Sequence, residues 1–235
     1  MSGVTFWRVV RAEWTKLFAL RSTWVVLGVV PQMLVGLSAL IGAQGGGTGG
    51  GAGGVTQAVG GGFLVFAVVY GGFGVLAMSG EYGSGLIRAT FAAVPRRLPV
   101  LWAKAVVLVA ATGPVLVVTY LLAFLANQAF AGRPIGLGDP GVVRAIVGVA
   151  GATVLVGLLG LGFLLRHTAV AVSAYLAVLV VLPPVFVALL PGALVPYLPT
   201  VALQAMFHVG AAVPPMPSPG AGAVVAAGWV AAACR

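Results

Sequence analysis

Charged side chains in this chain are confined to short segments that separate long apolar runs. The 235 residues are 61% hydrophobic and only 6% charged, whereas a soluble domain carries roughly 25% charged residues. A soluble fold of this size has too small an interior to bury so much apolar surface. The bilayer must therefore be the solvent, and the length fits one membrane domain, 1–235.

The apolar runs predict an all-α polytopic membrane protein with six transmembrane helices. An amphipathic segment, 1–21, precedes spans at 22–42, 57–79, 100–126, 142–165, 168–190 and 220–235. We expect Pro31, Gly113–Pro114 and Pro183–Pro184 to kink or interrupt their spans. The last apolar run, 221–234, covers only about 21 Å of the ~30 Å hydrocarbon core. A short sixth span and a longer natural chain both stay open.

The basic residues predict the orientation of these spans. With the N-terminus in the cytoplasm, the outside holds only Arg133 and Arg144. The inside then holds Arg8, Arg11, Lys16, Arg21, Arg88, Arg96, Arg97, Lys104, Arg166 and Arg235. This asymmetry is what the positive-inside rule produces, so the net charge of +9 reflects topology and does not indicate nucleic-acid binding. We expect a multi-pass protein of a bacterial plasma (inner) membrane with both termini cytoplasmic.

The N-terminal segment has the pattern of a helix that lies in the membrane interface. One side of its helical wheel is apolar and carries Phe6, Trp7, Val10, Trp14, Leu17 and Phe18. Tryptophan at headgroup depth and cations toward lipid phosphates suit such a helix. We assign to it Trp7, Arg8, Arg11, Glu13, Trp14 and Lys16. The alternative is a plain cytoplasmic extension of the first span, and we favour the interfacial helix.

The polar stretch 80–99 interrupts the apolar sequence between spans two and three. It contains Glu81, one of three carboxylates in the chain, together with three arginines. Gly83 allows the chain to turn out of the membrane, Ser84 can cap a short helix, and Pro95 can end it. A rigid cytoplasmic helix that serves a partner as a handle is one interpretation. A basic loop held by lipid phosphates is the other, and the residues alone favour neither.

The sequence lacks the motifs that enzymes and self-powered pumps need. The glycine run at 45–54 contains no lysine, so it cannot form a phosphate-binding loop, and the chain cannot drive itself with ATP. His167 and His208 are far apart and have no carboxylate at ligand spacing, which argues against a metal site. No carboxylate falls in the middle of a predicted span, which argues against a proton or sodium antiporter. We expect no enzymatic activity in this chain.

Two motifs resemble bacterial ABC transporter permeases of the second exporter type, particularly actinobacterial members. The first is Arg11-Ala12-Glu13-Trp14-Thr15-Lys16-Leu17 followed by Leu20-Arg21-Ser22-Thr23-Trp24. The second runs from Gly80-Glu81-Tyr82 to Pro95-Arg96-Arg97. The two motifs stand in the expected order and at the expected spacing. Together with the six predicted spans, they extend the resemblance over essentially the whole chain. Gly83 departs from the pattern, because a basic residue often stands there.

The resemblance implies an assembly and a role for each segment. In such permeases an interfacial helix precedes span one, and the loop between spans two and three docks on a separate ATPase subunit. Two permeases, identical or different, work with two ATPases, which bind the ATP and magnesium. An outer re-entrant segment would correspond to 191–219. The residues that the resemblance assigns to coupling are Glu81, Tyr82, Arg88, Thr90, Arg96 and Arg97.

This interpretation places the transport pathway between two permease copies, lined partly by spans two and five. The candidates to line it are Phe66, Tyr70, Phe73 and Tyr175, although we favour a helix-packing role for them. We expect close helix contacts at Gly71, Gly74, Gly157 and Gly160. Two other functions stay open: an ATP-independent carrier or channel, and a non-transporting scaffold or sensor subunit. Drug, peptide, lipid and glycan cargo are all compatible with the sequence.

Overall fold

The computed structural model describes residues 5–44, 51–83, 97–132, 140–162, 168–208 and 216–233. For 51–61, Met78, 80–83, 97–99 and Gly162 it describes the backbone alone. All regular elements in these ranges are helices, and no strand occurs among them. The prediction of an all-helical chain is therefore confirmed for the described part.

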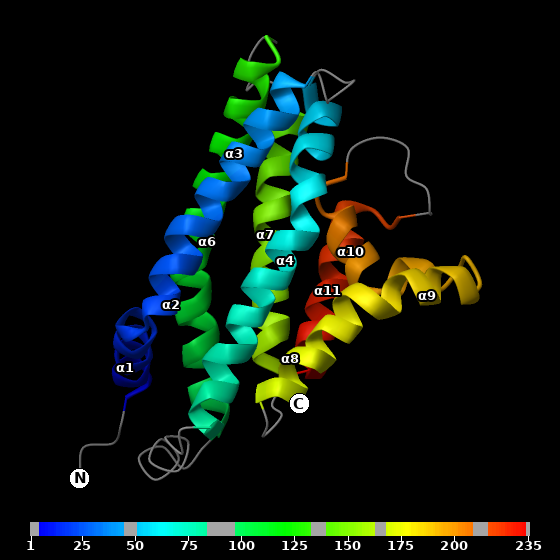
Figure 1. The fold of residues 1–235 in the computed structure, drawn as a ribbon. Coiled ribbons are helices and arrows are strands. Elements are labelled where there is room, and N and C mark those ends of the chain that lie inside the picture. Colours follow the sequence, from blue (N-terminus) through cyan, green and yellow to red (C-terminus); the bar gives the residue numbers. More distant parts are fainter. Residues whose placement is uncertain are drawn as a thin grey trace.

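Most of the described residues belong to long helices (Figure 1). The N-terminal half forms α1 (Phe6–Ala19), α2 (Arg21–Trp24), the π-helical turn η1 (Val25–Val29), α3 (Val30–Ala43) and α4 (Gly51–Gly83). The middle forms α6 (Arg97–Phe130) and α7 (Pro140–Gly162). The remainder forms α8 (Thr168–Leu176), the π-helical turn η2 (Ala177–Val181), α9 (Leu182–Leu189), the 3₁₀-helix η3 (Val195–Tyr197), α10 (Pro199–Ala205) and α11 (Pro219–Ala233).

Four helices in the described part are long and apolar enough to cross a membrane. They are Arg21–Ala43, Val100–Phe130, Pro140–Leu161 and Thr168–Leu189. Two further apolar helices, Gly62–Ala77 and Pro219–Ala233, are shorter. The first of these is the part of α4 with described side chains, and the backbone of α4 is helical over 33 residues. The chain is thus a membrane protein by the length and composition of its helices.

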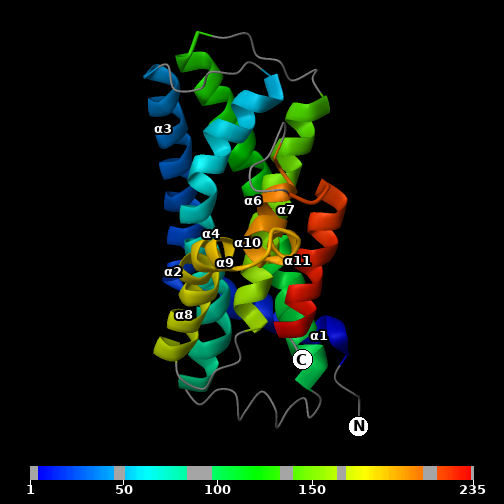
Figure 2. The same cartoon turned by 90° about the vertical axis from the view of Figure 1, so that its right-hand side faces the viewer.

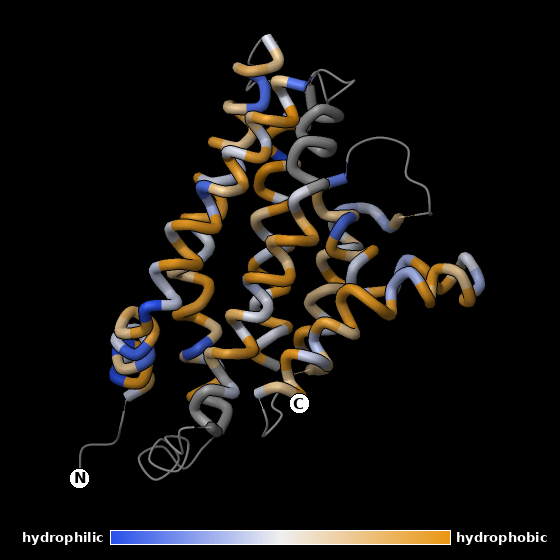
Figure 3. Tube along the Cα trace, viewed as in Figure 1, coloured by the Kyte–Doolittle hydropathy of each residue, from blue (hydrophilic) through white to orange (hydrophobic). Residues whose placement is uncertain are grey.

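The bundle is built around α4 and α7, which pack against each other more extensively than any other described pair. The next closest pair is α3 and α6, and α6 also packs on α7. Figures 1 and 2 show α1, the end of α4, the start of α6 and the end of α11 at one end of this bundle. Apolar residues run along the central helices, whereas hydrophilic residues gather on α1 and near helix ends (Figure 3).

Glycines allow α4 and α7 to approach closely. A Cβ atom on Gly74 would overlap the carbonyl oxygen of Gly157, and one on Gly160 would overlap that of Gly71. Such contacts between backbones are the usual way in which membrane helices associate. The prediction that these four glycines lie at close helix contacts is confirmed.

Prolines follow π-helical turns in two of the long apolar helices, Arg21–Ala43 and Thr168–Leu189. Pro31 follows η1 and Pro183 follows η2, and in each turn the last N–H bonds five residues back, from Val30 to Val25 and from Leu182 to Ala177. The wider turn removes the clash that a proline ring causes in an α-helix. By contrast, α6 continues through Pro114 as one helix. The interruption expected in span five is present, and Figure 1 shows α9 turning away from α8.

The proline-rich segment after α9 folds back onto the bundle. Within 191–219 the structure describes η3 and α10, and six of the seven α10 residues are buried. A Cβ on Gly148 of α7 would overlap the carbonyl oxygen of Met206, and one on Gly222 of α11 would contact Ala202. A short apolar helix was expected over 201–212. The observed helix α10 begins earlier, because Pro199 supplies its first turn, and it ends at Ala205.

Candidate functional site

The candidate site is the junction where α1 packs on the first turns of α6. One strip of α1 is buried there, formed by Val9, Val10, Glu13 and Leu17. Val100, Ala103 and Val107 belong to the same apolar cluster from the α6 side. A carboxylate inside an apolar strip is unusual, because charged groups are rarely buried unless they are paired.

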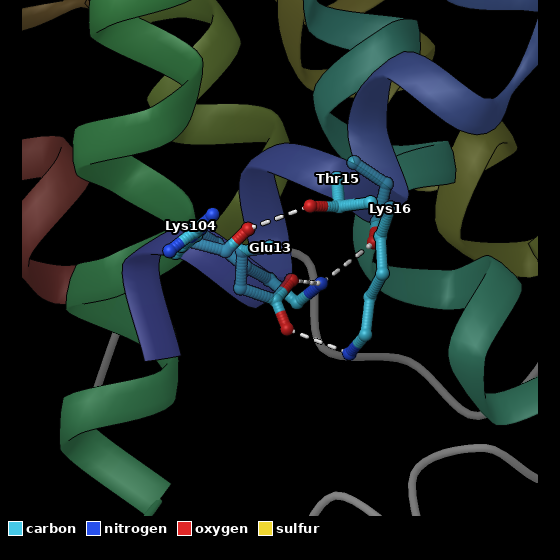
Figure 4. A network of polar contacts seen from close by, with 6 residues as sticks. Glu13, Thr15, Lys16 and Lys104 are labelled. Atoms are coloured by element: carbon cyan, nitrogen blue, oxygen red, sulfur yellow. Dashed lines mark hydrogen bonds and ion pairs between the residues drawn. The ribbon is translucent and has the colours of Figure 1, made fainter. Parts of the chain in front are cut away.

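Glu13 is paired with two lysines (Figure 4). Its Oε2 atom lies 2.6 Å from Nζ of Lys104 on α6, and its Oε1 atom lies 2.7 Å from Nζ of Lys16 on α1. The Lys104 ammonium group also donates to the main-chain oxygen of Ala77 on α4, at 3.4 Å. One carboxylate thus joins α1 to α6, and one ammonium group joins α6 to α4.

The two ion pairs differ in their surroundings. The side chains of Glu13 and Lys104 are 4% and 8% exposed, whereas that of Lys16 is 41% exposed. Water screens an exposed pair, which contributes roughly 0–1 kcal/mol. Removing one partner of a buried pair costs about 3–5 kcal/mol, since it leaves an uncompensated charge. The Glu13–Lys104 pair is therefore the one that fixes α1 in position.

The corner between α1 and α2 is also fixed by specific bonds. Leu20 is extended, so the helix stops there, and of the last carbonyls of α1 the Leu17 oxygen accepts a bond from the Leu20 N–H. The Thr23 hydroxyl donates to the main-chain oxygen of Leu17, and the Trp24 indole N–H donates to that of Phe18, at 3.2 Å. The Thr23-Trp24 pair in the first motif thus has a local function as a helix cap.

The structure divides the apolar face that the helical wheel assigned to α1 into a buried part and an exposed part. Val10 and Leu17 are buried against the bundle, but Trp7 is 73% exposed and Trp14 is 41% exposed. The buried strip is instead centred between Glu13 and Leu17. The wheel treats all apolar residues as one class, whereas this helix presents some to protein and others outward.

Sequence reasoning found the members of this site but not their arrangement. It assigned Glu13 to the interfacial helix and counted Lys104 only as a cation of the inner side. Their contact across 91 positions was not predicted. The signal was present, however, because Lys104 is a lone cation within an apolar run and such a residue needs a partner.

Three of the residues predicted for coupling lie beside the segment 84–96, which is outside the described residues, and three lie within it. Glu81 and Tyr82 are in the last turn of α4, and Arg97 is the first residue of α6. Arg88, Thr90 and Arg96 lie in the segment outside the description. The ends of α4 and α6 that bound the segment 84–96 are the ends beside the Glu13–Lys104 pair.

The aromatic residues proposed to line a pathway are buried in the described chain. Phe66, Tyr70, Phe73 and Tyr175 are each at most 4% exposed. The Tyr175 hydroxyl donates to the main-chain oxygen of Ala67 at 2.6 Å and occupies the space beside Gly71. These contacts are those of helix packing, and the pathway role stays a prediction.

Tyr70 has a specific structural task. In the π-helical pattern of η1 the residue that would donate to the Val26 carbonyl is Pro31, which has no N–H. The Tyr70 hydroxyl donates to that oxygen instead, at 3.3 Å. An α4 side chain thus satisfies the main-chain group that proline leaves unpaired in span one.

Comparison with family models and with curated proteins identifies no family for this chain. No family model and no curated protein matches the chain. Among the described residues there is also no group of three His, Cys, Asp or Glu side chains that could hold a metal ion. The two sequence motifs and the geometry of the α1–α6 junction are therefore the features that indicate a function.

Proposed function

We propose that the chain is the membrane-spanning permease subunit of an ATP-driven exporter of the ABC type. It moves a substrate out of the cytoplasm by alternating access, and a separate ATPase subunit supplies the energy. The sequence support is the pair of motifs around 11–24 and 80–97. The observation that carries the proposal is that Glu13 of the first motif binds Lys104, beside the helix ends that bound the second motif.

This geometry offers a route by which movement at 84–96 reaches the rest of the membrane domain. The segment 84–96 connects α4 to α6, so displacement by a partner acts on both helices. Lys104 contacts α4 through Ala77 and α1 through Glu13. The three helices would then move together at this end. Transmission of this kind requires contacts that stay formed while the helices move, and a buried ion pair between two long side chains has that property.

The proposed topology has six spans and two cytoplasmic termini. The spans correspond to α2–η1–α3, α4, α6, α7, α8–η2–α9 and α11. Arg8, Arg11 and Lys16 lie on α1 and would face the cytoplasm with the start of α6. Arg144 lies on the first turns of α7, at the opposite end of the bundle. This distribution supports the orientation given by the positive-inside rule in a bacterial inner membrane.

The proposed working unit contains two permease copies and two ATPase subunits. The pathway would lie between the copies, with α4 and α8–η2–α9 on its sides. In support of this location, 17% of an 18-residue stretch of Thr168–Leu189 is buried within the chain, close to the 22% for Arg21–Ala43 and far below the 56% for Pro140–Leu161. A helix with so little internal packing has most of its surface available to lipid or to a second copy.

Reconstitution with an ATPase tests the function. The chain and the ATPase encoded beside its gene would be co-expressed, purified and placed in lipid bilayers. We expect a stable complex whose ATP hydrolysis changes when the permease is present, and a cysteine at Ala89 or Thr90 that cross-links to the ATPase. Substrate flux without any ATPase would identify a carrier or channel. A stable complex in which no nucleotide-dependent conformational change of the permease occurs would identify a scaffold or sensor.

A further inference from the structure

The surface of α1 divides into three arcs, because successive residues of an α-helix turn by about 100°. The first arc faces the bundle and contains the buried strip around Glu13. The second contains Trp7 and Trp14, which are exposed, and Phe18, which is half-buried. The third contains Arg8, Arg11 and Thr15, and all three are exposed. The aromatic arc thus separates the basic arc from one edge of the buried strip.

The aromatic arc continues onto neighbouring helices. The Trp14 and Phe18 ring centroids lie 4.8 Å apart, and those of Phe18 and Trp24 lie 5.7 Å apart. Trp24 at the start of span one and Trp102 at the start of α6 are each 64% exposed. Exposed tryptophans at one end of a set of apolar helices are typical of the headgroup level of a membrane.

Among the described side chains, no carboxylate neutralises the basic arc. Glu13 is the only carboxylate between residues 1 and 80. It is buried and bound to Lys104 and Lys16, so it is turned away from the exposed arginines. Arg21, at the start of α2, adds another exposed cation. Burial of the carboxylate therefore leaves Arg8, Arg11 and Arg21 available to an external anion.

We propose that the exposed side of α1 binds the headgroups of anionic phospholipids. The tryptophans set the depth of the helix, and the arginines bind the phosphate groups of acidic lipids in the same leaflet. The proposal requires a membrane location but does not depend on export or on an ATPase.

An anionic lipid fits this surface better than an acidic protein does. Tryptophan and arginine also occur together in protein-docking surfaces, but here exposed tryptophans recur beyond α1, at Trp24 and Trp102. Trp7 is the most exposed aromatic residue on α1, and Arg11 is its neighbour one turn further along the helix surface. Tryptophan favours the interface of a membrane, and arginine favours the phosphate groups found there. The boundary of an acidic leaflet supplies both.

Spin-labelled lipids provide the test. The full chain would be placed in phosphatidylcholine bilayers that also contain phosphatidylglycerol. Electron paramagnetic resonance then gives the association of spin-labelled phosphatidylglycerol relative to spin-labelled phosphatidylcholine. We expect a clear preference for phosphatidylglycerol. Replacing Arg8 and Arg11 together by Gln should reduce that preference, by up to roughly fivefold per arginine for a lipid bound at this surface. High salt should also reduce it.

A matched control separates this surface from general charge. Arg144→Gln removes an exposed arginine from the opposite end of the bundle. It should change the preference less than Arg11→Gln, although both variants lose one charge. Equal effects of the two variants, or an unchanged preference in the Arg8→Gln/Arg11→Gln variant, would overturn the proposal.

Two further outcomes also contradict it. If inorganic phosphate at constant ionic strength removes the preference, the arginines bind free phosphate and not lipid. If the Arg8→Gln/Arg11→Gln variant keeps the lipid preference but loses a bound ATPase, α1 is a protein-docking surface. Circular dichroism of each variant would confirm that the helices are retained.

Discussion

The α4–α7 interface and the α1–α6 junction are held together by opposite means. At α4–α7, Gly74 and Gly160 place backbone against backbone, and a tight fit of shapes leaves no space for a side chain. At α1–α6 a single carboxylate, Glu13, reaches Lys104 across an otherwise apolar contact. Close backbone packing therefore joins the two central helices, whereas a buried ion pair within an apolar contact joins α1 to α6.

The difference indicates what each region can do. A close-packed glycine interface has no neighbouring arrangement of similar energy, because a sliding helix would meet backbone atoms. An ion pair between long side chains can shift by small rotations of either chain while it stays bonded. The centre is thus suited to being rigid, and the junction is suited to guided movement. Four substitutions test this comparison.

The largest effect is expected from Gly74→Val. The added side chain would meet the main chain of Gly157, so the two helices must separate, at a cost of about 3 kcal/mol. Thermal unfolding in detergent, followed by size-exclusion chromatography, measures the loss. Gly72→Val is the matched control, because no atom lies within 4 Å of a Cβ at that position on the same helix. Equal loss in both variants would show that valine disturbs α4 itself and not its interface with α7.

Lys104→Met should have the next largest effect. The buried Glu13 carboxylate then still has Lys16 as a partner. We therefore expect the free energy of unfolding to fall by about 2 kcal/mol, less than the ~3 kcal/mol expected for a fully unpaired buried charge. Adding Glu13→Gln to this variant removes the buried charge and should recover much of the loss. Chemical denaturation of the four members of this double-mutant cycle measures the coupling. Additive losses would mean that the pair does not hold α1.

Tyr70→Phe should cost about 1 kcal/mol, because it leaves the Val26 carbonyl without the donor that replaces Pro31. The readout is the unfolding temperature in detergent. Tyr197→Phe serves as the control, since Tyr197 is 61% exposed and the same hydroxyl is removed from it. If the unfolding temperature falls as far in the control as in Tyr70→Phe, the bond from Tyr70 to the Val26 carbonyl does not stabilise the protein.

Lys16→Gln should have the smallest effect, roughly 0.5 kcal/mol, because this side chain is partly exposed and its charge is screened. Lys16 and Lys104 bind the two oxygens of one carboxylate, so the two variants compare a partly exposed partner with a buried partner of the same group. The free energy of unfolding at low and high salt is the measurement. A loss for Lys16→Gln that matches Lys104→Met would refute the distinction between them.

Local patterns predicted much of the fold. Long apolar runs gave the helices now described over Arg21–Ala43, Val100–Phe130, Pro140–Leu161 and Thr168–Leu189. Small residues also predicted close helix contacts at Gly71, Gly74, Gly157 and Gly160, and the structure shows which of them meet. These features depend on residues close in sequence or on a general preference of membrane helices, so one chain is enough to find them.

The candidate site was harder to predict because it depends on tertiary contacts. Glu13 and Lys104 are far apart in the chain, and no spacing rule joins them. The sequence also did not show which apolar residues of α1 pack on the bundle and which, like Trp14, are exposed. Protein and lipid are both apolar surroundings, and a helical wheel cannot distinguish between them. Only the position of the buried strip, set by the packing of α1 on α6, separates the two.

The two π-helical turns have a consequence for the length of the chain. Each turn, Val25–Val29 and Ala177–Val181, accommodates about one residue more than an α-helical turn does. Loss of one residue within either turn can be absorbed by tightening the turn, so the buried sides of α3 and α9 stay in place. The same deletion elsewhere in these spans rotates everything beyond it by about 100°. Related chains of different length should therefore differ at these two turns, and the prolines that follow them should be lost together with the extra residue.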